Sequence, residues 1–144
     1  MLVLAGDGVM REELEHLAGE LGVALRVRFL GAFRTPPNIL RFADVFLLTS
    51  RSEGMPNSLV EAAAVGVPGV VTAVGGVPSL VADIPDNFFM ADSPTPTHVA
   101  PLLLGLLERD TRDSVREARA IEYVQRHHSP QQVLNRLLAA LGLA

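Results

Sequence analysis

The sequence contains no cysteine, which excludes disulfides and thiolate metal sites and fits a reducing compartment. It also lacks an uninterrupted apolar run of the roughly 18 residues that a transmembrane helix needs. The N-terminus enters an apolar run at Leu2 without the basic start and cleavage signal of a secretory peptide. These features predict a cytoplasmic protein without a membrane-spanning segment.

Charge is scarce as well, since charged residues make up 19% of the chain and the net charge is −4. Proteins that bind nucleic acid usually carry a basic face, so we expect no nucleic-acid partner. Apolar residues account for 49% of the 144 residues, which is enough for a real core. The composition therefore favours one folded domain over residues 1–144 rather than a disordered chain.

Short apolar runs alternate with amphipathic stretches over the first 93 residues. The runs predict strands at 2–5, 27–30, 45–48, 69–72 and 87–90, with helices at 10–21, 36–42 and 58–65. Strands that alternate with helices favour right-handed βαβ units, and continuously apolar strands are typical of a sheet covered on both faces. We predict an α/β fold, a Rossmann-like three-layer α/β/α arrangement with a mostly parallel sheet of about five strands.

Residues 94–144 carry only helical patterns and are predicted to form a helical C-terminal tail of the same domain. Helices are expected at 99–108 and 111–127. A third helix begins at a clear signal, with Ser129 as the N-cap, Pro130 at the first helical position and Gln132 at the third.

The most informative stretch runs from Ser50 to Ala62, after one predicted strand and into a helix. Loops at the carboxyl ends of parallel strands bind ligands in α/β proteins, and a helix N-terminus suits a phosphate. Glu53 and Glu61 bracket the loop with seven residues between them. Because a carboxylate accepts two hydrogen bonds, each glutamate suits a pair of neighbouring sugar hydroxyls.

A purely structural interpretation of the same stretch stands beside the functional one. Residues 58–61 have the pattern of a capping box, in which the Glu61 side chain bonds back to the Ser58 amide. Glu53 would then be a solvated charge, and Gly54 and Pro56 would be turn residues.

Six landmarks in order make the functional interpretation more specific: Gly6-Asp7-Gly8, Phe29-Leu30-Gly31, Ala43-Asp44-Val45-Phe46, Glu53-Gly54 through Glu61, Gly66-Val67-Pro68 and Gly75-Gly76-Val77-Pro78. This series closely resembles the C-terminal, donor-binding domain of the family 4 (group 1) glycosyltransferases, which have two Rossmann-like domains in the GT-B fold. The resemblance extends to about Met90 and implies a nucleotide diphosphate sugar as the ligand.

The resemblance implies a role for each matching residue. Glu53, the candidate catalytic residue, would lie against the donor sugar, and Glu61 would hold the ribose hydroxyls of the nucleotide. The sugar pocket would be lined by the backbone of Gly54, Met55, Pro56 and Asn57. The diphosphate would meet the amides of Ser58 and Leu59. Gly31 and the residues after it would lie beside the base, and Gly6 is a further candidate substrate-binding residue.

The resemblance also implies a reaction and partners. Transfer would retain the anomeric configuration without a metal, and no cofactor is expected. The N-terminal acceptor-binding domain and the arginine and lysine that neutralise the leaving diphosphate match nothing in this chain. We therefore expect a fragment that is inactive alone, from an enzyme that could associate peripherally with a membrane. Two departures are Ser79, where the family usually has a glutamate, and Gly69, where it often has a proline.

Two other function classes stay open. One is a sugar-nucleotide epimerase of the same fold, and the other is a non-catalytic module that binds a nucleotide or a partner protein. Other sequence features indicate no further site. His127 and His128 near a helix end are expected to cap the helix or lie in solvent, and His16 and His98 lack carboxylate or cysteine partners at metal-ligand spacing. Gly6-x-Gly8 lacks the third glycine of a dinucleotide fingerprint.

The resemblance carries one structural consequence for the sheet. In the family's strand order, the strand that precedes Leu2 lies between the strands at 2–5 and 45–48, and nothing in this chain matches it. We expect these two strands to pair directly or a homodimer to fill the gap, with the uncovered apolar surface at a subunit contact or exposed.

Overall fold

The computed structural model describes residues 1–32, 39–109 and 113–141. The chain divides into two compact units, residues 1–36 and 37–144, which we describe separately. The prediction of a single domain over residues 1–144 stays a prediction. Two helices predicted from the sequence begin outside the described residues, the one at 36–42 and the one at 111–127.

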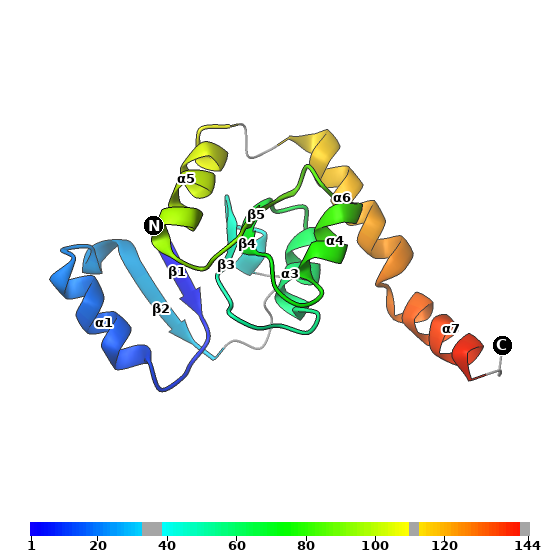
Figure 1. The fold of residues 1–144 in the computed structure, drawn as a ribbon, viewed down its shortest axis with the longest axis horizontal. Coiled ribbons are helices and arrows are strands. Elements are labelled where there is room, and N and C mark those ends of the chain that lie inside the picture. The colour runs from blue at the N-terminus through cyan, green and yellow to red at the C-terminus, as the bar shows by residue number, and fades with distance from the viewer. Residues whose placement is uncertain (33–38, 110–112, 142–144) are drawn as a thin grey trace. The chain divides into compact units, whose positions relative to one another are not determined.

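The first unit is a two-stranded parallel sheet with one helix, blue in Figure 1. Its elements are β1 (Leu2–Ala5), α1 (Arg11–Glu20), the short 3-10 helix η1 (Ala24–Arg26) and β2 (Val27–Gly31). Helix α1 ends as its sequence predicts, because Gly22 follows with a φ of 67° and its amide donates to the Gly19 carbonyl.

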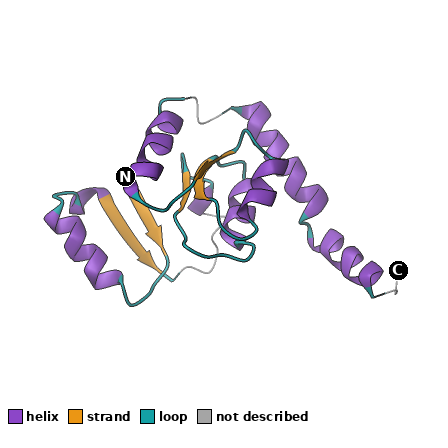
Figure 2. Cartoon of the chain, viewed as in Figure 1, coloured by secondary structure: helices purple, strands orange, loops and turns teal. Residues whose placement is uncertain are grey.

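The second unit contains a three-stranded parallel sheet in the order β3-β4-β5. Its elements are β3 (Phe46–Leu48), α3 (Asn57–Ala64), β4 (Gly69–Thr72), α4 (Val77–Asp83), β5 (Phe88–Ala91), α5 (Pro96–Leu107), α6 (Ser114–His127) and α7 (Pro130–Ala140). Figure 2 shows the strands in orange and the helices in purple. The sequence did not predict α4, a seven-residue helix that begins directly after Gly75-Gly76 and has Pro78 in its first turn.

Helices cover both faces of this sheet, which is why β4 is buried at every position. On one face, α3, α4 and α6 form a core with residues such as Leu59, Leu80 and Phe88. On the other face, α5 packs against Val70 and Ala91. Val70 and Val71 point to opposite faces of the sheet, and each lies in a different core. Burial on both faces therefore explains the continuously apolar strand, as predicted.

Helix α6 is tied to α4 by a polar contact as well as by the core. The Tyr123 hydroxyl donates to the Asp83 carboxylate. Burial and this hydrogen bond raise the pKa of Tyr123 to about 12. The start of α6 is capped by the Asp113 side chain, which accepts from the Val115 and Arg116 amides.

Helix α7 begins as predicted, with the Ser129 hydroxyl accepting from the Gln132 amide at 3.4 Å. The apolar residues along α7 are not buried, however. Val133, Leu134 and Leu137 are all exposed, and no described residue of α7 is buried. None of the helices in the described ranges is long and apolar enough to cross a bilayer.

All five predicted strands are present and every pair is parallel, which confirms the α/β class with a helical C-terminal end. Within the first unit β1 pairs with β2, and within the second β3 pairs with β4 and β4 with β5. Direct pairing of the strands at 2–5 and 45–48, the uncovered apolar surface and the homodimer stay predictions.

Candidate functional site

The central segment of the candidate site is the donor loop, which we define as residues 50–56 between β3 and α3. It leaves the carboxyl end of β3, and β4 lies beside β3 with Leu48 paired to Val71. Within the loop, Glu53 is half-buried, Gly54 and Met55 are exposed and Pro56 is buried. The loop thus lies at the sheet edge where parallel α/β proteins bind ligands.

Helix α3 begins at Asn57, one residue earlier than predicted. Pro56 is the N-cap, with extended backbone angles of −71° and 117°, and its carbonyl accepts from the amides of Leu59 and Val60. The capping box at 58–61 is therefore wrong. Ser58 lies at the second helical position and Glu61 at the fifth, not at the N-cap and third positions that a capping box needs, and the helix has no side-chain cap.

The first two amides of α3 are left without an acceptor. Within the described part of the chain, neither the Asn57 amide nor the Ser58 amide donates a hydrogen bond, whereas the Leu59 amide bonds to the Pro56 carbonyl at 3.1 Å. Unpaired amides and the positive end of the helix dipole together suit an anion. Ser58 and Leu59 are the two positions predicted to meet a diphosphate. In the structure Ser58 has an unpaired amide and Leu59 does not, and Asn57 has the second unpaired amide.

The two glutamates have different surroundings. Glu53 accepts a hydrogen bond from the Ser50 hydroxyl, with 2.7 Å between Oγ and Oε1. Glu61 is half-buried, and its side chain has neither a hydrogen bond nor an ion pair with any residue that the structure describes. Asn57 and Glu61 are four residues apart on α3, so they lie on the same side of the helix.

Gly75 and Gly76 contact the backbone of the donor loop. The Gly76 amide donates to the Gly54 carbonyl at 2.6 Å. Gly75 has a φ of 54°, and a Cβ there would lie 1.8 Å from the Glu53 carbonyl oxygen. The two glycines therefore allow a backbone-to-backbone approach that no other residue at position 75 would permit.

Gly6 and Gly31 lie together in the first unit. The Gly6 amide donates to the Gly31 carbonyl at 2.9 Å, in an isolated bridge at the carboxyl ends of β1 and β2. The segment 33–38, which the resemblance places beside the base, lies outside the described residues.

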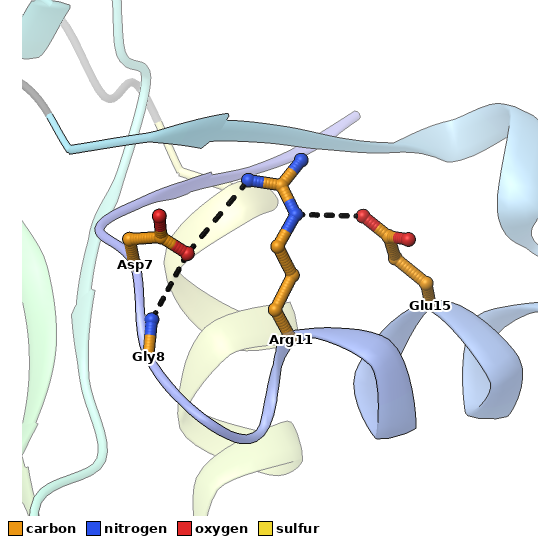
Figure 3. Close-up of polar contacts among 4 residues, drawn as sticks. All are labelled: Asp7, Gly8, Arg11 and Glu15. Carbon is orange, nitrogen blue, oxygen red and sulfur yellow. Dashed lines mark hydrogen bonds and ion pairs between the residues drawn. The ribbon is translucent and has the colours of Figure 1, made fainter.

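Arg11 lies beside Gly31. Figure 3 shows its guanidinium between two carboxylates, with Nε 2.9 Å from Glu15 and Nη1 4.0 Å from Asp7. The guanidinium also lies over the Phe29 ring, and a Cβ on Gly31 would be 3.5 Å from Nη1. Sequence reasoning did not select Arg11, since a lone arginine at a helix start carries no distinctive pattern.

Two residues that hold the donor loop were also missed. The sequence analysis assigned no role to Ser50, the first residue of the informative stretch, or to Thr72, which is buried at the end of β4. The Thr72 hydroxyl donates to the Ser50 carbonyl at 2.6 Å, across 22 positions of sequence. No local motif could have revealed such a contact.

Two negative observations complete the geometry. The described residues contain no group of three or more histidine, aspartate or glutamate side chains placed to hold a metal ion. A cavity of about 350 Å³ lies between residues 83–87 and α6, and no residue of the donor loop or α3 lines it.

Comparison with known proteins identifies relatives of this chain. It is 41% identical over 93 residues to the Vi polysaccharide biosynthesis protein VipC/TviE of Salmonella typhi, covering 65% of this chain and 16% of that protein. It is 30% identical over 134 residues to N-acetyl-alpha-D-glucosaminyl L-malate synthase of Bacillus anthracis, covering 93% of this chain and 35% of that protein.

Among solved structures, Anabaena HepE in complex with UDP has the same fold, with a TM-score of 0.87 at 22% identity. That alignment covers 99% of this chain and 40% of HepE, so the chain spans less than half the length of each of these three proteins. Residues 1–109 match the family described as glycosyl transferases group 1. The chain therefore belongs to the group 1 glycosyltransferase family, as its ordered landmarks predicted.

Proposed function

We propose that this chain binds a nucleotide diphosphate sugar at the donor loop and the N-terminus of α3, as the donor-binding part of a retaining, metal-independent glycosyltransferase that transfers a hexose. The observation that carries the proposal is the pair of unpaired amides at Asn57 and Ser58, bracketed by the carboxylates of Glu53 and Glu61. The amides suit the diphosphate, and the two carboxylates suit hydroxyls on either side of it.

Each side chain has a distinct part in this proposal. Glu61 would accept from the ribose hydroxyls, a role for which its carboxylate has no competing partner in the described residues. Glu53 would face the sugar with Oε2, because Oε1 already accepts from Ser50. The backbone from Gly54 to Asn57 would line the sugar pocket. Complexes of HepE with UDP and with UDP-glucose support a donor of this class.

Calorimetric titration tests the proposal against its two rivals. UDP, GDP and ADP would be compared with UDP-glucose, GDP-mannose and ADP-glucose. We expect one base to be preferred and the matching nucleotide sugar to bind without being consumed. Epimerisation of the bound nucleotide sugar would favour the epimerase, and a failure to bind any of the six would favour a module that recognises a protein.

Residues 1–144 alone should bind the donor without transferring its sugar at a meaningful rate. The leaving diphosphate needs positive charge, and the arginine and lysine that supply it in the family match nothing in this chain. In addition, the family's acceptor domain matches nothing in this sequence. Incubating the purified chain with a radiolabelled nucleotide sugar and a panel of acceptors would check this. Steady multiple turnover would contradict it.

A further inference from the structure

The Glu53 carboxylate is held by a chain of hydrogen bonds that begins inside the sheet. The Thr72 side chain, 1% exposed at the carboxyl end of β4, donates to the Ser50 carbonyl at 2.6 Å. The Ser50 hydroxyl in turn donates to Glu53 Oε1 at 2.7 Å. The two contacts connect a rigid, fully buried strand to a half-buried carboxylate in a loop.

Each contact restricts a different degree of freedom. A glutamate side chain loses much rotamer entropy when it is fixed, so a loop glutamate without a partner samples several orientations. A hydroxyl-to-carboxylate hydrogen bond is charge-assisted and among the stronger ones, so it selects one orientation. Thr72 fixes the backbone of Ser50, and without it the Ser50 hydroxyl would have no defined position.

The backbone of Glu53 is restricted independently. The Gly76 amide holds the Gly54 carbonyl at 2.6 Å, and Gly75 lies directly against the Glu53 carbonyl. With the backbone held by the glycines and Oε1 held by Ser50, the second oxygen is left for a ligand. None of these contacts involves Glu61 or the amides at the start of α3.

We infer that Ser50 and Thr72 are positioning residues that aim Glu53 at the donor sugar. This inference rests on the proposed function, since it concerns the sugar end of the same site. It implies a separation of effects, because the Ser50 and Thr72 hydroxyls would control how the sugar is held and not how the nucleotide is held. A structural role in the loop as a whole would affect both.

The test compares a nucleotide with its nucleotide sugar in the same variants. Kd for UDP and for UDP-glucose, or for the pair that the titration above selects, would be measured for Ser50→Ala, Ser50→Thr, Thr72→Val and Thr72→Ser. We expect Ser50→Ala and Thr72→Val to weaken nucleotide-sugar binding about tenfold and nucleotide binding by less than about twofold. Ser50→Thr and Thr72→Ser keep the hydroxyl and should restore most of the nucleotide-sugar affinity.

Several outcomes would overturn the inference. Equal loss of affinity for both ligands would make the hydroxyls part of the general loop structure, and no loss for either would leave them without a role. Failure of Ser50→Thr to recover affinity would exclude the hydroxyl as the cause. If Thr72→Val does not fold, the pair at Ser50 decides the result alone. If the unmodified chain binds neither ligand, the proposed function itself fails and the inference fails with it.

Discussion

Replacing Gly75 with alanine should disrupt the donor loop more than the same change at any other glycine that the structure describes. The new Cβ would lie 1.8 Å from the Glu53 carbonyl oxygen and 2.7 Å from its carbonyl carbon. Because both atoms belong to the backbone, the loop itself would have to move. The φ of 54° adds a further cost for an L-residue. We expect Gly75→Ala to lower the free energy of unfolding by about 3 kcal/mol.

The same substitution should also remove nucleotide-sugar binding from molecules that remain folded. A displacement of about 1 Å in a binding group costs on the order of a hundredfold in enzymes, and Glu53 would be displaced together with its backbone. Denaturant unfolding and calorimetry would measure the two effects.

The matched control is Gly105→Ala in helix α5. A Cβ at Gly105 would meet nothing within 4 Å, and φ there is not in the left-handed region. Alanine is favoured over glycine in a helix by up to about 1 kcal/mol, so this variant should be slightly more stable and should bind normally. If Gly75→Ala matched the unmodified chain in both stability and affinity, the close approach of Gly75 to Glu53 would not be what holds the loop.

Changing Glu61 to glutamine should weaken nucleotide binding while leaving stability nearly unchanged. Glutamine keeps the size and helix propensity of glutamate but loses the charge that accepts strongly from two ribose hydroxyls. Hydrogen bonds to a charged group contribute about 1.5–3 kcal/mol, and we expect a loss of about 1–3 kcal/mol in binding free energy. That loss corresponds to roughly 5- to 150-fold in Kd.

The structure sharpens this prediction, because Glu61 has no partner in the described residues whose loss could destabilise the helix. Glu13→Gln is a suitable control, since Glu13 is exposed on α1 and lies outside the candidate site. A lower melting temperature for Glu61→Gln with unchanged nucleotide affinity would give Glu61 a structural role after all.

Periodicity identified most of the elements that position the site, and it predicted both ends of β4 correctly. Burial on both faces leaves a strong signal, because every position of such a strand must be apolar or small. Helix α4 was missed since seven residues with a proline in the first turn show too little periodicity. The exposed stripe of α7 shows the converse, because an amphipathic pattern predicts a helix without saying what covers it.

The candidate site was predictable as a loop, and its internal geometry was not. A capping box and a proline N-cap compete for the same few residues, and Pro56 fixes the chain so that the helix starts at Asn57. The contact of Ser50 with Thr72 depends on two strands lying side by side, which no local pattern encodes.

The most direct test of the donor site follows the backbone amides of the ¹⁵N-labelled chain by NMR during titration with the nucleotide sugar that binds best. A diphosphate at the start of α3 would change the environment of the amides that lack an acceptor, so the largest shift changes should occur at Asn57 and Ser58, with smaller ones from Glu53 to Met55. Shift changes confined to residues 83–87 and 116–127, around the cavity beside α6, would contradict the account. So would a titration that leaves the Asn57 and Ser58 signals unmoved at saturation.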